Sequence, residues 1–492
     1  MTWGRVARWT VGALALGSVV AAAQDVAAPP QVRTEASAVE PTDAGVDGGI
    51  DAADASGNVI LIIGDGMDDQ QITMARNYLV GVRGKLVIDS MPVRGAVQVL
   101  TVTDDDPGKP VFVADSANSG TAMATGVVTS RGRIATSAGK DEDLPTIVEL
   151  ARKAGLRTGI VATSSVADAT PASFMAHINY RFCQSPAAMV QVERKGVVIG
   201  DCSQDLKKNG GLGSIAEQVA ASGVDVLLGG GGEHFAPNVE GGDHSVRRAA
   251  EEAGYQVVTT GAALVAAPTD KKLLGLFSPD TMPVRLRGEG GRVGEKPERS
   301  ALNYLHWALG TVDQPAPMKC EDNPEFAGVP TLKQMGEAAL RHLSAPGDDT
   351  PFFLMIESAS IDKQAHKRNP CGSIGELQQL DEVVRSALDF ADAHPGTLVI
   401  VTSDHGSGAH IIPDRSLFAT FPVPIYTPGH LVRVTTPEGA TMAVNYATND
   451  FPLEEHTGVQ VPIFANELGR EVIAPVIAQP DLFGIVKAHL GL

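Results

Sequence analysis

The residues best suited to chemistry are one serine and a set of acids and histidines spread along the chain. Ser116 follows Asp115 in the stretch VADSANSGTAMATG, which reads as a tight turn entering a short helix. A serine hydroxyl is a weak nucleophile until a base or a metal ion activates it. No histidine lies near Ser116 in the sequence, so its activating group must come from elsewhere in the fold.

Several acids and a histidine stand at the ends of apolar runs. Asp65 lies in GDG, Glu357 closes the run PFFLMIES, and Asp404 and His405 are adjacent in TSDHG. In open α/β sheets, ligands bind beyond the carboxyl ends of the strands. We therefore expect these four side chains to converge on one crevice.

Two more histidines and another acid extend this set. Asp362 and His366 are four residues apart in ESASIDKQAH, which places both on one face if the segment is helical, and His456 lies in EEHTG, an expected loop. Each motif alone also fits a turn, a helix cap or a surface hydrogen bond. Together, such crowded acids would raise one another's pKa unless cations neutralised them. Zn²⁺ accepts histidine and carboxylate ligands and Mg²⁺ prefers oxygen, so the residue types suit both ions.

The elements that must position these residues follow from the hydrophobic pattern. Short apolar, β-branched runs, typical of strands covered on both faces, occupy residues 58–66, 157–165, 224–232, 255–260, 351–358 and 397–406. Amphipathic stretches such as residues 143–155 and 375–394 lie between them. This alternation predicts an α/β fold with a mostly parallel central sheet and helices on both faces, a three-layer sandwich. Residues 286–300 read as a mobile surface loop.

The N-terminal region is expected to lie outside the fold. Residues 1–23 have the basic start, short apolar run and small residues of a secretory signal peptide, and residues 24–56 read as a disordered Ala/Pro/Asp-rich tether. Residues 57–492 are then a single catalytic domain. The apolar run is too short to span a membrane. The formal net charge of −19 argues against a role in nucleic-acid binding.

Long motifs in a shared order make the chain resemble a bacterial alkaline phosphatase. They run from NVILIIGDGM through DSANSGTAMATG, VATSSVADATPASFMAHINYRFC, GVPTLKQMGEAAL, ESASIDKQAHKRNPCGSIGELQQLDEVV and VIVTSDHG to EEHTGVQVPIFA. The resemblance implies the alkaline-phosphatase-like fold and hydrolysis of small phosphomonoesters at alkaline pH, releasing phosphate and an alcohol. It also implies two Zn²⁺ and one Mg²⁺, a homodimer, and a periplasmic or secreted location.

The resemblance also assigns roles, motif by motif. Ser116 resembles the nucleophile that becomes phosphoserine, and a cation beside it would favour its ionised form without a histidine base. Arg181 resembles a clamp on the phosphate, with Asp168 and Lys363 ordering the phosphate and the magnesium waters. The implied metal ligands are Asp362, His366 and His456 for one zinc, Asp65, Asp404 and His405 for the second, to which the Ser116 oxygen also binds, and Asp65, Thr170 and Glu357 for magnesium.

The four cysteines permit three pairings, and an exported chain favours disulfides. The resemblance implies the pairs Cys183–Cys202 and Cys320–Cys371. The histidines outside the motifs, including His177 and His234, are interpreted as ordinary surface or packing residues.

Two departures from the family pattern keep alternatives open. Asp68 stands where the family usually has glycine; Asp tolerates a left-handed backbone, but it adds negative charge near the metals. Ser407 replaces a second histidine that many bacterial relatives carry, a change that could weaken zinc binding. One alternative is therefore a degenerate, non-catalytic binder of phosphate or metal. The other is a phosphodiesterase of the same superfamily, which differs in the room left for a second ester group.

Overall fold

The computed structural model describes residues 57–194 and 197–492. The predicted signal peptide (residues 1–23) and tether (residues 24–56) lie outside the described residues. In the described part of the chain, none of the helices combines the length and apolar character needed to cross a bilayer.

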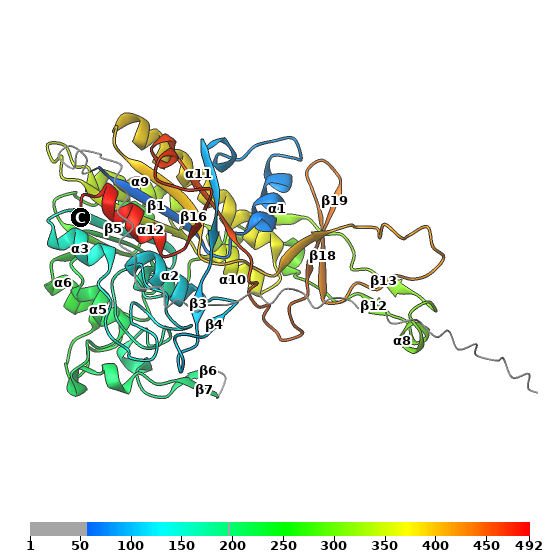
Figure 1. Ribbon diagram of the computed structural model, residues 1–492, viewed down its shortest axis with the longest axis horizontal. Helices are drawn as coiled ribbons and strands as arrows, with labels where there is room; N and C mark the ends of the chain where they lie inside the picture. Colours follow the sequence, from blue (N-terminus) through cyan, green and yellow to red (C-terminus); the bar gives the residue numbers. More distant parts are fainter. Residues whose placement is uncertain (1–56, 195–196) are drawn as a thin grey trace, which may run out of the picture. The chain divides into compact units, whose positions relative to one another are not determined.

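Within these residues the central sheet has ten strands in the order β21-β2-β20-β16-β1-β15-β5-β8-β10-β9 (Figure 1). Their bounds are β1 (Val59–Gly64), β2 (Val93–Gln98), β5 (Arg157–Ser165), β8 (Val226–Gly230), β9 (Tyr255–Val258), β10 (Lys272–Leu276), β15 (Phe352–Ser358), β16 (Leu398–Ser403), β20 (Val461–Ala465) and β21 (Val476–Ala478). Strand β20 runs antiparallel to its neighbours β16 and β2, and the other neighbouring pairs are parallel. All six predicted apolar runs form strands of this mostly parallel sheet.

Helices cover both faces of the sheet, which confirms the three-layer prediction. In β1, Val59, Leu61 and Ile63 point into one hydrophobic cluster, whereas Ile60 and Ile62 point into another. The first cluster packs against α2 (Ser116–Thr125), α3 (Ile147–Lys153), α4 (Ala169–Ala172), α5 (Ile215–Ala221), α6 (Val246–Glu252) and α12 (Asp481–His489). The second packs against α1 (Asp69–Leu79), α7 (Gly261–Ala266), α9 (Leu332–Leu343), α10 (Ser360–His366) and α11 (Pro370–Ala393).

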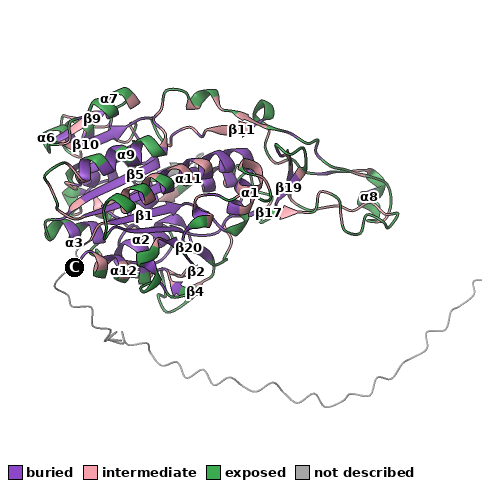
Figure 2. Cartoon of the chain, turned by 90° about the horizontal axis from the view of Figure 1, so that it is seen from above, coloured by how far each residue is buried: buried purple, intermediate pink, exposed green. Residues whose placement is uncertain are grey.

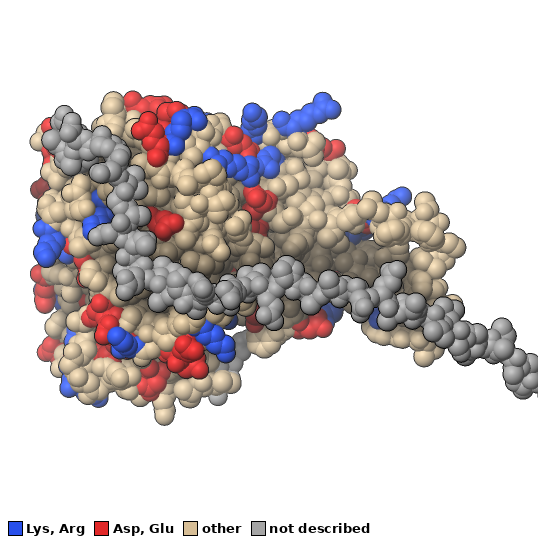
Figure 3. Space-filling view, in the orientation of Figure 1, with Lys and Arg blue, Asp and Glu red and all other residues tan. Residues whose placement is uncertain are grey.

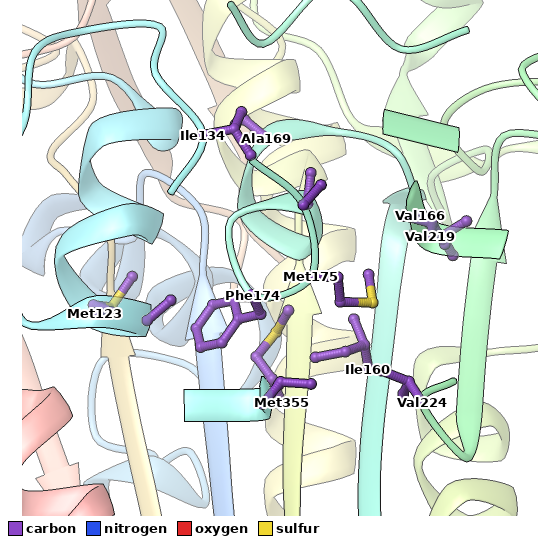
Figure 4. Close-up of a cluster of buried hydrophobic side chains, with 14 of the residues drawn as sticks. Met123, Ile134, Ile160, Val166, Ala169, Phe174, Met175, Val219, Val224 and Met355 are labelled. Carbon is purple, nitrogen blue, oxygen red and sulfur yellow. The ribbon is translucent and has the colours of Figure 1, made fainter. Parts of the chain in front are cut away.

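The figures show the same layering. The strands of the central sheet are buried between helices whose outer sides are exposed (Figure 2). Phe174 and Met355 lie side by side in the first cluster, close to Met123 of α2 and Ile160 of β5 (Figure 4). This dry packing makes the central strands rigid supports for the loops that follow them.

The prediction of a mobile surface loop over residues 286–300 is wrong at both ends of this segment, where the chain forms short strands. β11 (Leu286–Gly288) pairs with β14 (Cys320–Asp322), and β12 (Glu298–Arg299) pairs with β13 (Val312–Asp313), just before and after the short helix α8 (Ala301–Leu305). The partner strands lie up to 36 positions away, so the local pattern does not reveal these pairs. The remaining small sheets are β3 (Thr101–Val102) with β4 (Pro110–Val111), β6 (Val192–Arg194) with β7 (Val197–Gly200), and β17 (Ala409–Ile412) with β19 (Thr441–Tyr446) and β18 (His430–Thr435).

The structure contains the disulfides Cys183–Cys202 and Cys320–Cys371, the pairs that the resemblance implies. The second joins β14 to the first turn of α11, close to the helix α10 that carries Asp362 and His366. On the face shown in Figure 3, acidic and basic side chains are interspersed wherever grey atoms do not cover it.

Candidate active site

The register of the parallel strands brings the predicted acids to one edge of the sheet. Gly64, the last residue of β1, lies opposite Ser403, the last residue of β16. Asp65 and Asp404 therefore follow at neighbouring strand ends, and Glu357 lies one residue before the end of β15, on the other side of β1. At most 4% of each of these three acids is exposed. The expected convergence at the carboxyl ends of the strands is present.

Asp65, Asp404 and His405 form one buried group of potential metal ligands. His405 Nε2 lies 3.4 Å from Asp65 Oδ1 and 3.3 Å from Asp404 Oδ2. Asp404 Oδ1 accepts a hydrogen bond from the backbone N–H of Gly66 at 2.9 Å, which ties the two ligand-bearing turns together. Among the described residues, neither Asp65 Oδ1 nor Asp404 Oδ2 has a hydrogen-bond partner. Buried carboxylate oxygens without donors are suited to a cation.

The second group consists of Asp362, His366 and His456. Asp362 and His366 lie on one face of α10, with Asp362 Oδ2 3.1 Å from His366 Nε2, and Asp362 Oδ1 lies 3.4 Å from His456 Nε2. The Nδ1 atom of His456 donates to the carbonyl of Ala114 at 2.9 Å, and that of His366 donates to the carbonyl of Glu454.

In both rings Nδ1 is the donor to a carbonyl, so Nε2 is the atom that can face a metal ion, and the two Nε2 atoms lie 3.1 Å apart. The charge of Asp362 raises the pKa of His366 to about 9, so in the bare protein the His366 ring is protonated and its Nε2–H donates to Asp362. A cation would replace this proton at the same nitrogen. A backbone carbonyl on the far nitrogen is the usual support for a metal-bound histidine.

The two groups adjoin because of one glycine. Gly66 has a φ of 66°, and a Cβ atom there would lie 2.9 Å from the Cβ of Asp362. Glycine therefore permits both the left-handed turn after Asp65 and the close approach of α10. The rings of His405 and His456 stack with their centroids 3.6 Å apart, one from each group.

Ser116 is the first residue of α2, and its position is set by the residue before it. Asp115 caps the helix in a capping box with Asn118: its Oδ1 accepts from the Asn118 backbone, and the Asn118 side chain accepts from the Asp115 backbone. The hydroxyl of Ser116 lies 3.2 Å from Nε2 of His405, although the two residues are 289 positions apart. Ser116 thus lies beside the group containing Asp65 and Asp404.

Arg181, Asp168 and Lys363 form a chain of ion pairs next to the serine. Arg181 donates through Nη1 to Asp115 Oδ2 at 3.1 Å and lies 3.4 Å from Asp168 Oδ1 through Nη2. Asp168 Oδ2 accepts from the Lys363 ammonium. Arg181 Nε is buried without a hydrogen-bond partner among the described residues, so it has an N–H available for an anion.

Thr170 and Glu357 lie at the third implied site. Asp168 caps α4 and so positions Thr170, whose hydroxyl is buried and lacks a hydrogen-bond partner within the described chain. Glu357 Oε2 accepts from the Ser164 hydroxyl at 2.6 Å. Burial raises the pKa of Glu357 to about 7, although the hydrogen bond from Ser164 opposes the shift.

The electrostatics of the bare protein show a need for positive charge. Burial, reinforced by the charges of Asp404 and Asp362, holds the pKa of Asp65 well above its usual value, and burial raises the pKa of Asp404 to about 6. Burial also lowers the pKa values of His405 and His456 to about 4, so both rings are neutral ligands near neutral pH. A cation would stabilise each of these ligand states.

All predicted site residues are therefore close to one another, and the donor set fits metal ions. Ser116, Arg181, Lys363, His366 and His456 line one cleft of about 770 Å³.

Other contributors became visible only in the structure. They include the Arg181 partner Asp115, the carbonyls of Ala114 and Glu454, and the His405–Ser116 contact. The spacing of Asp115 and Asn118 is a capping pattern that could have been detected. Carbonyl contacts across hundreds of positions leave no local signal. His234 Nε2 lies 3.9 Å from Glu233 Oε1 and 3.6 Å from Asp280 Oδ1, and these three residues form a third group whose atoms could hold a metal ion; Asp280 also lines the cleft that contains Ser116.

The interpretation of Asp68 needs correction. Its backbone is extended, with φ −82° and ψ 177°, and not left-handed. Its side chain caps α1 by accepting from the backbone N–H groups of Gln70 and Gln71, and it also accepts from the N–H of Ser407 at 3.1 Å. The two departures from the family pattern are therefore in direct contact.

The family model described as alkaline phosphatase matches residues 56–492. The chain is 42% identical over 448 residues to the streptomycin-6-phosphate phosphatase of Streptomyces griseus, covering 88% of this chain and 90% of that protein. It is 39% identical over 444 residues to the alkaline phosphatase of Escherichia coli K12, covering 88% and 86%.

Solved structures agree on the fold. The alkaline phosphatase of the Antarctic bacterium TAB5 superposes with a TM-score of 0.61 at 22% identity, over 89% of this chain and 98% of that one. The alkaline phosphatase of Thermus thermophilus gives a TM-score of 0.60 at 22% identity, over 89% and 92%.

Proposed function

The chain belongs to the alkaline phosphatase family, and from this premise we propose that Ser116 is the nucleophile with which it hydrolyses phosphate monoesters. The family is metal-dependent and works through a phosphoserine, so the activity is that of a phosphoric monoester hydrolase. The observation that carries the assignment is the position of Ser116 at the start of α2, 3.2 Å from His405 and within the cleft lined by both ligand groups.

The reaction has two displacements. Ser116 gives its proton to hydroxide, and its Oγ forms a bond to phosphorus while the bond from phosphorus to the alcohol oxygen breaks; the departing alcohol oxygen takes a proton from water, which regenerates the hydroxide. A water molecule then forms a bond to phosphorus as the Ser116–phosphorus bond breaks, and one of its protons passes to Ser116 Oγ, which releases inorganic phosphate and the free serine. Because the transition state is loose and spreads its charge, the protein acts mainly by positioning and by electrostatic stabilisation.

Arg181 supplies much of that positioning. The salt bridges to Asp115 and Asp168 fix the plane of its guanidinium, and its unpaired Nε–H is available to a phosphate oxygen. Although burial opposes it, the charges of Asp115 and Asp168 raise the pKa of Arg181, which stays cationic. Lys363, held by Asp168, adds a second positive charge to the cleft.

The metal sites are proposed as two Zn²⁺ and one Mg²⁺. Asp362, His366 and His456 would hold one zinc, and Asp65, Asp404 and His405 the other; both sets mix imidazole with carboxylate, as zinc prefers. Thr170 and Glu357, with Asp65, form an oxygen-only set of the kind magnesium prefers. When bound, the cations supply positive charge that favours the ionised Ser116 hydroxyl and neutralises the phosphoryl oxygens.

Two alternative functions are a non-catalytic binder of phosphate or metal and a phosphodiesterase. A non-catalytic binder is excluded by the family assignment, and Asp68 serves as a helix cap rather than marking a decayed site. A diesterase side activity is a separate question, tested by comparing turnover of aryl phosphate monoesters and diesters.

The remaining proposals concern the whole chain. Residues 57–492 are treated as one catalytic domain, and the chain is proposed to be exported to the periplasm or the medium, where disulfides persist. A homodimer is proposed from the family, with sedimentation velocity as its test.

The covalent route is tested by rapid-quench kinetics. Metal-loaded enzyme mixed with an aryl phosphate should release a burst of alcohol close to one equivalent per active site, followed by a slower steady rate. Ser116→Ala should abolish the burst and lower the steady rate by at least about 10³-fold, since nucleophile removal leaves only residual electrostatic catalysis. Substantial turnover in Ser116→Ala would contradict the assignment.

A further inference from the structure

Asp68 connects two segments that are far apart in the sequence. Its Oδ1 atom accepts from the N–H groups of Gln70 and Gln71, both at 3.0 Å, in the first turn of α1. Its Oδ2 atom accepts from the N–H of Ser407 at 3.1 Å, across 339 positions. The side chain is 5% exposed. One buried carboxylate thus joins the start of α1 to the segment after Asp404 and His405.

A second bond joins the same two segments. The Nε2 atom of Gln71 donates to the hydroxyl of Ser407 at 2.8 Å, and both residues are almost fully buried. Ser407 therefore presents its backbone N–H and its hydroxyl to one turn of α1. We refer to Asp68, Gln71 and Ser407 as the 68–407 lock.

The two bonds hold residue 407 through different atoms. Without the Asp68 carboxylate, the Ser407 N–H would be a buried donor without its partner, and without the Ser407 hydroxyl, the Gln71 Nε2 atom would lose its acceptor. The lock lies directly beside the turns that carry Asp65 on one side and Asp404 with His405 on the other.

We propose that the 68–407 lock positions the Asp404–His405 turn against Asp65, and so sets how tightly the cation bound by these three residues is held. The inference rests on the proposed metal centre described above. The group of Asp362, His366 and His456 has its own anchors, because His456 donates to Ala114 and His366 to Glu454. The lock touches neither of these anchors, so its direct effect is on the cation held by Asp65, Asp404 and His405, although His405 also lies within 4.8 Å of Asp362 and His456.

The test measures zinc release from the full-length, zinc-loaded enzyme into an excess of a chromogenic chelator. Asp68→Asn keeps an oxygen to cap α1, but turns an amide N–H₂ group toward the N–H of Ser407. One release phase should become about 10- to 100-fold faster, the usual size of a lost supporting contact, while the other phase is unchanged. Variants Asp404→Asn and His456→Asn, each lacking one ligand, identify which phase belongs to which group.

Matched variants distinguish a specific effect on the position of the Asp404–His405 turn from a general loss of stability in this region. Asp69→Asn changes the adjacent residue, whose side chain is 68% exposed and paired with Arg94, and should leave both phases unchanged. Ser407→Ala removes the acceptor of Gln71 alone and should accelerate the same phase by a smaller factor. The double variant Asp68→Asn/Ser407→Ala should fall short of the product of the two single effects, since both act on one segment. A cobalt-loaded sample should show an altered visible spectrum in Asp68→Asn and not in Asp69→Asn.

The outcomes are decisive. Release rates within twofold of wild type in Asp68→Asn, or equal acceleration of both phases, overturn the lock while leaving the metal centre intact. A wild-type enzyme that retains no zinc overturns the metal centre and the lock together. If Asp68→Asn does not fold, Ser407→Ala alone decides by the same criteria.

Discussion

The role of each histidine in this chain follows from the contacts of its two ring nitrogens. In His366, Nδ1 donates to the carbonyl of Glu454 and Nε2 lies 3.1 Å from a carboxylate oxygen of Asp362, and the charge of Asp362 raises the pKa of His366 to about 9. In His177 the pattern is similar, with Nδ1 on the carbonyl of Ala135 and Nε2 on the carboxylate of Glu149. The difference is that a second imidazole, His456, faces His366 Nε2 at 3.1 Å, whereas His177 has a single carboxylate partner, so only the first arrangement gathers several ligand atoms in one place.

At the same scale, Arg181 should not tolerate replacement by lysine. Lysine keeps the charge but cannot contact Asp115 and Asp168 and also present a fixed N–H to phosphate. Hydrogen bonds to charged groups contribute about 1.5–3 kcal/mol, so Arg181→Lys should lower kcat/KM for an aryl phosphate by about 10- to 100-fold and weaken inhibition by inorganic phosphate. Steady-state kinetics with phosphate as inhibitor measures both effects.

The control is Arg433→Lys, which alters an arginine–carboxylate pair with Asp414 outside the cleft. It should leave kcat/KM unchanged. An Arg181→Lys enzyme within twofold of wild type would show that the guanidinium does not bind the substrate phosphate.

At the scale of elements, most of the strands that sequence reasoning found are buried along their whole length, but burial alone did not decide: β20 is buried at every position and was missed, and β9 was found although two of its four residues are half-buried. β1 and β16 are buried at every position, so their continuous apolar runs are visible without knowledge of the fold. Strand β2 was not predicted, because Arg94 and Gln98 are exposed and interrupt the apolar run, and because its partner β20 lies more than 360 positions away. Local pattern carries no record of such pairing.

The same distinction applies to the site. Asp65 and Asp404 could be placed from their positions at strand ends, and Asp362 with His366 from helical spacing. His456 lies in a loop without periodicity, and Arg181 follows a turn, so their roles came from resemblance alone. The Asp68–Ser407 contact could not be predicted from either source, because it depends on the three-dimensional register of α1 against the segment after β16.

One element provides a pH-dependent test of stability. His177, at the end of the segment that follows α4, packs against the first turn of α3 through Glu149, and Asp143 adds negative charge nearby. Burial alone would lower the pKa of His177, but the bonds to Glu149 and Ala135 raise it above its usual value. Burial alone would raise the pKa of Glu149, but the hydrogen bond from His177 lowers it below its usual value.

The directions of these two pKa shifts define the pH range in which the His177–Glu149 pair stabilises the fold. A raised histidine pKa gives stability that is fully present below the unfolded value of about 6.5 and is lost as pH rises through the folded value. A lowered glutamate pKa gives stability that is lost as pH falls below about 4.5. The Tm difference between wild type and His177→Gln should therefore be largest near pH 5–6 and shrink toward pH 9. A difference that grows with pH would contradict a cationic His177.

At the scale of the whole molecule, the site depends on segments collected from most of the chain. Its proposed ligands run from Asp65 to His456: they lie in the turns after β1 and β16, near the end of β15, on the two helices α4 and α10, and in one late loop. The disulfides lie near two of these segments: Cys183 follows Arg181 by two residues, and Cys371 follows His366 by five. Global stability and metal binding are consequently linked.

Removal of the metal ions should therefore destabilise the entire domain. In the bare protein, the acids Asp65, Asp404 and Glu357 are buried close together and their pKa values are raised. Their desolvation and mutual repulsion therefore destabilise the folded state. An ion that binds only the folded state adds about 2.7 kcal/mol when its free concentration is 100 times its Kd. Calorimetry at pH 8 should show a lower Tm after chelation, restored by Zn²⁺ with Mg²⁺. Ser116→Ala, which retains every acid and histidine of the metal sites, should lose and regain nearly the same increment, whereas Asp404→Asn should regain less. A Tm that is unaffected by chelation would show that these acids and histidines do not hold stabilising cations.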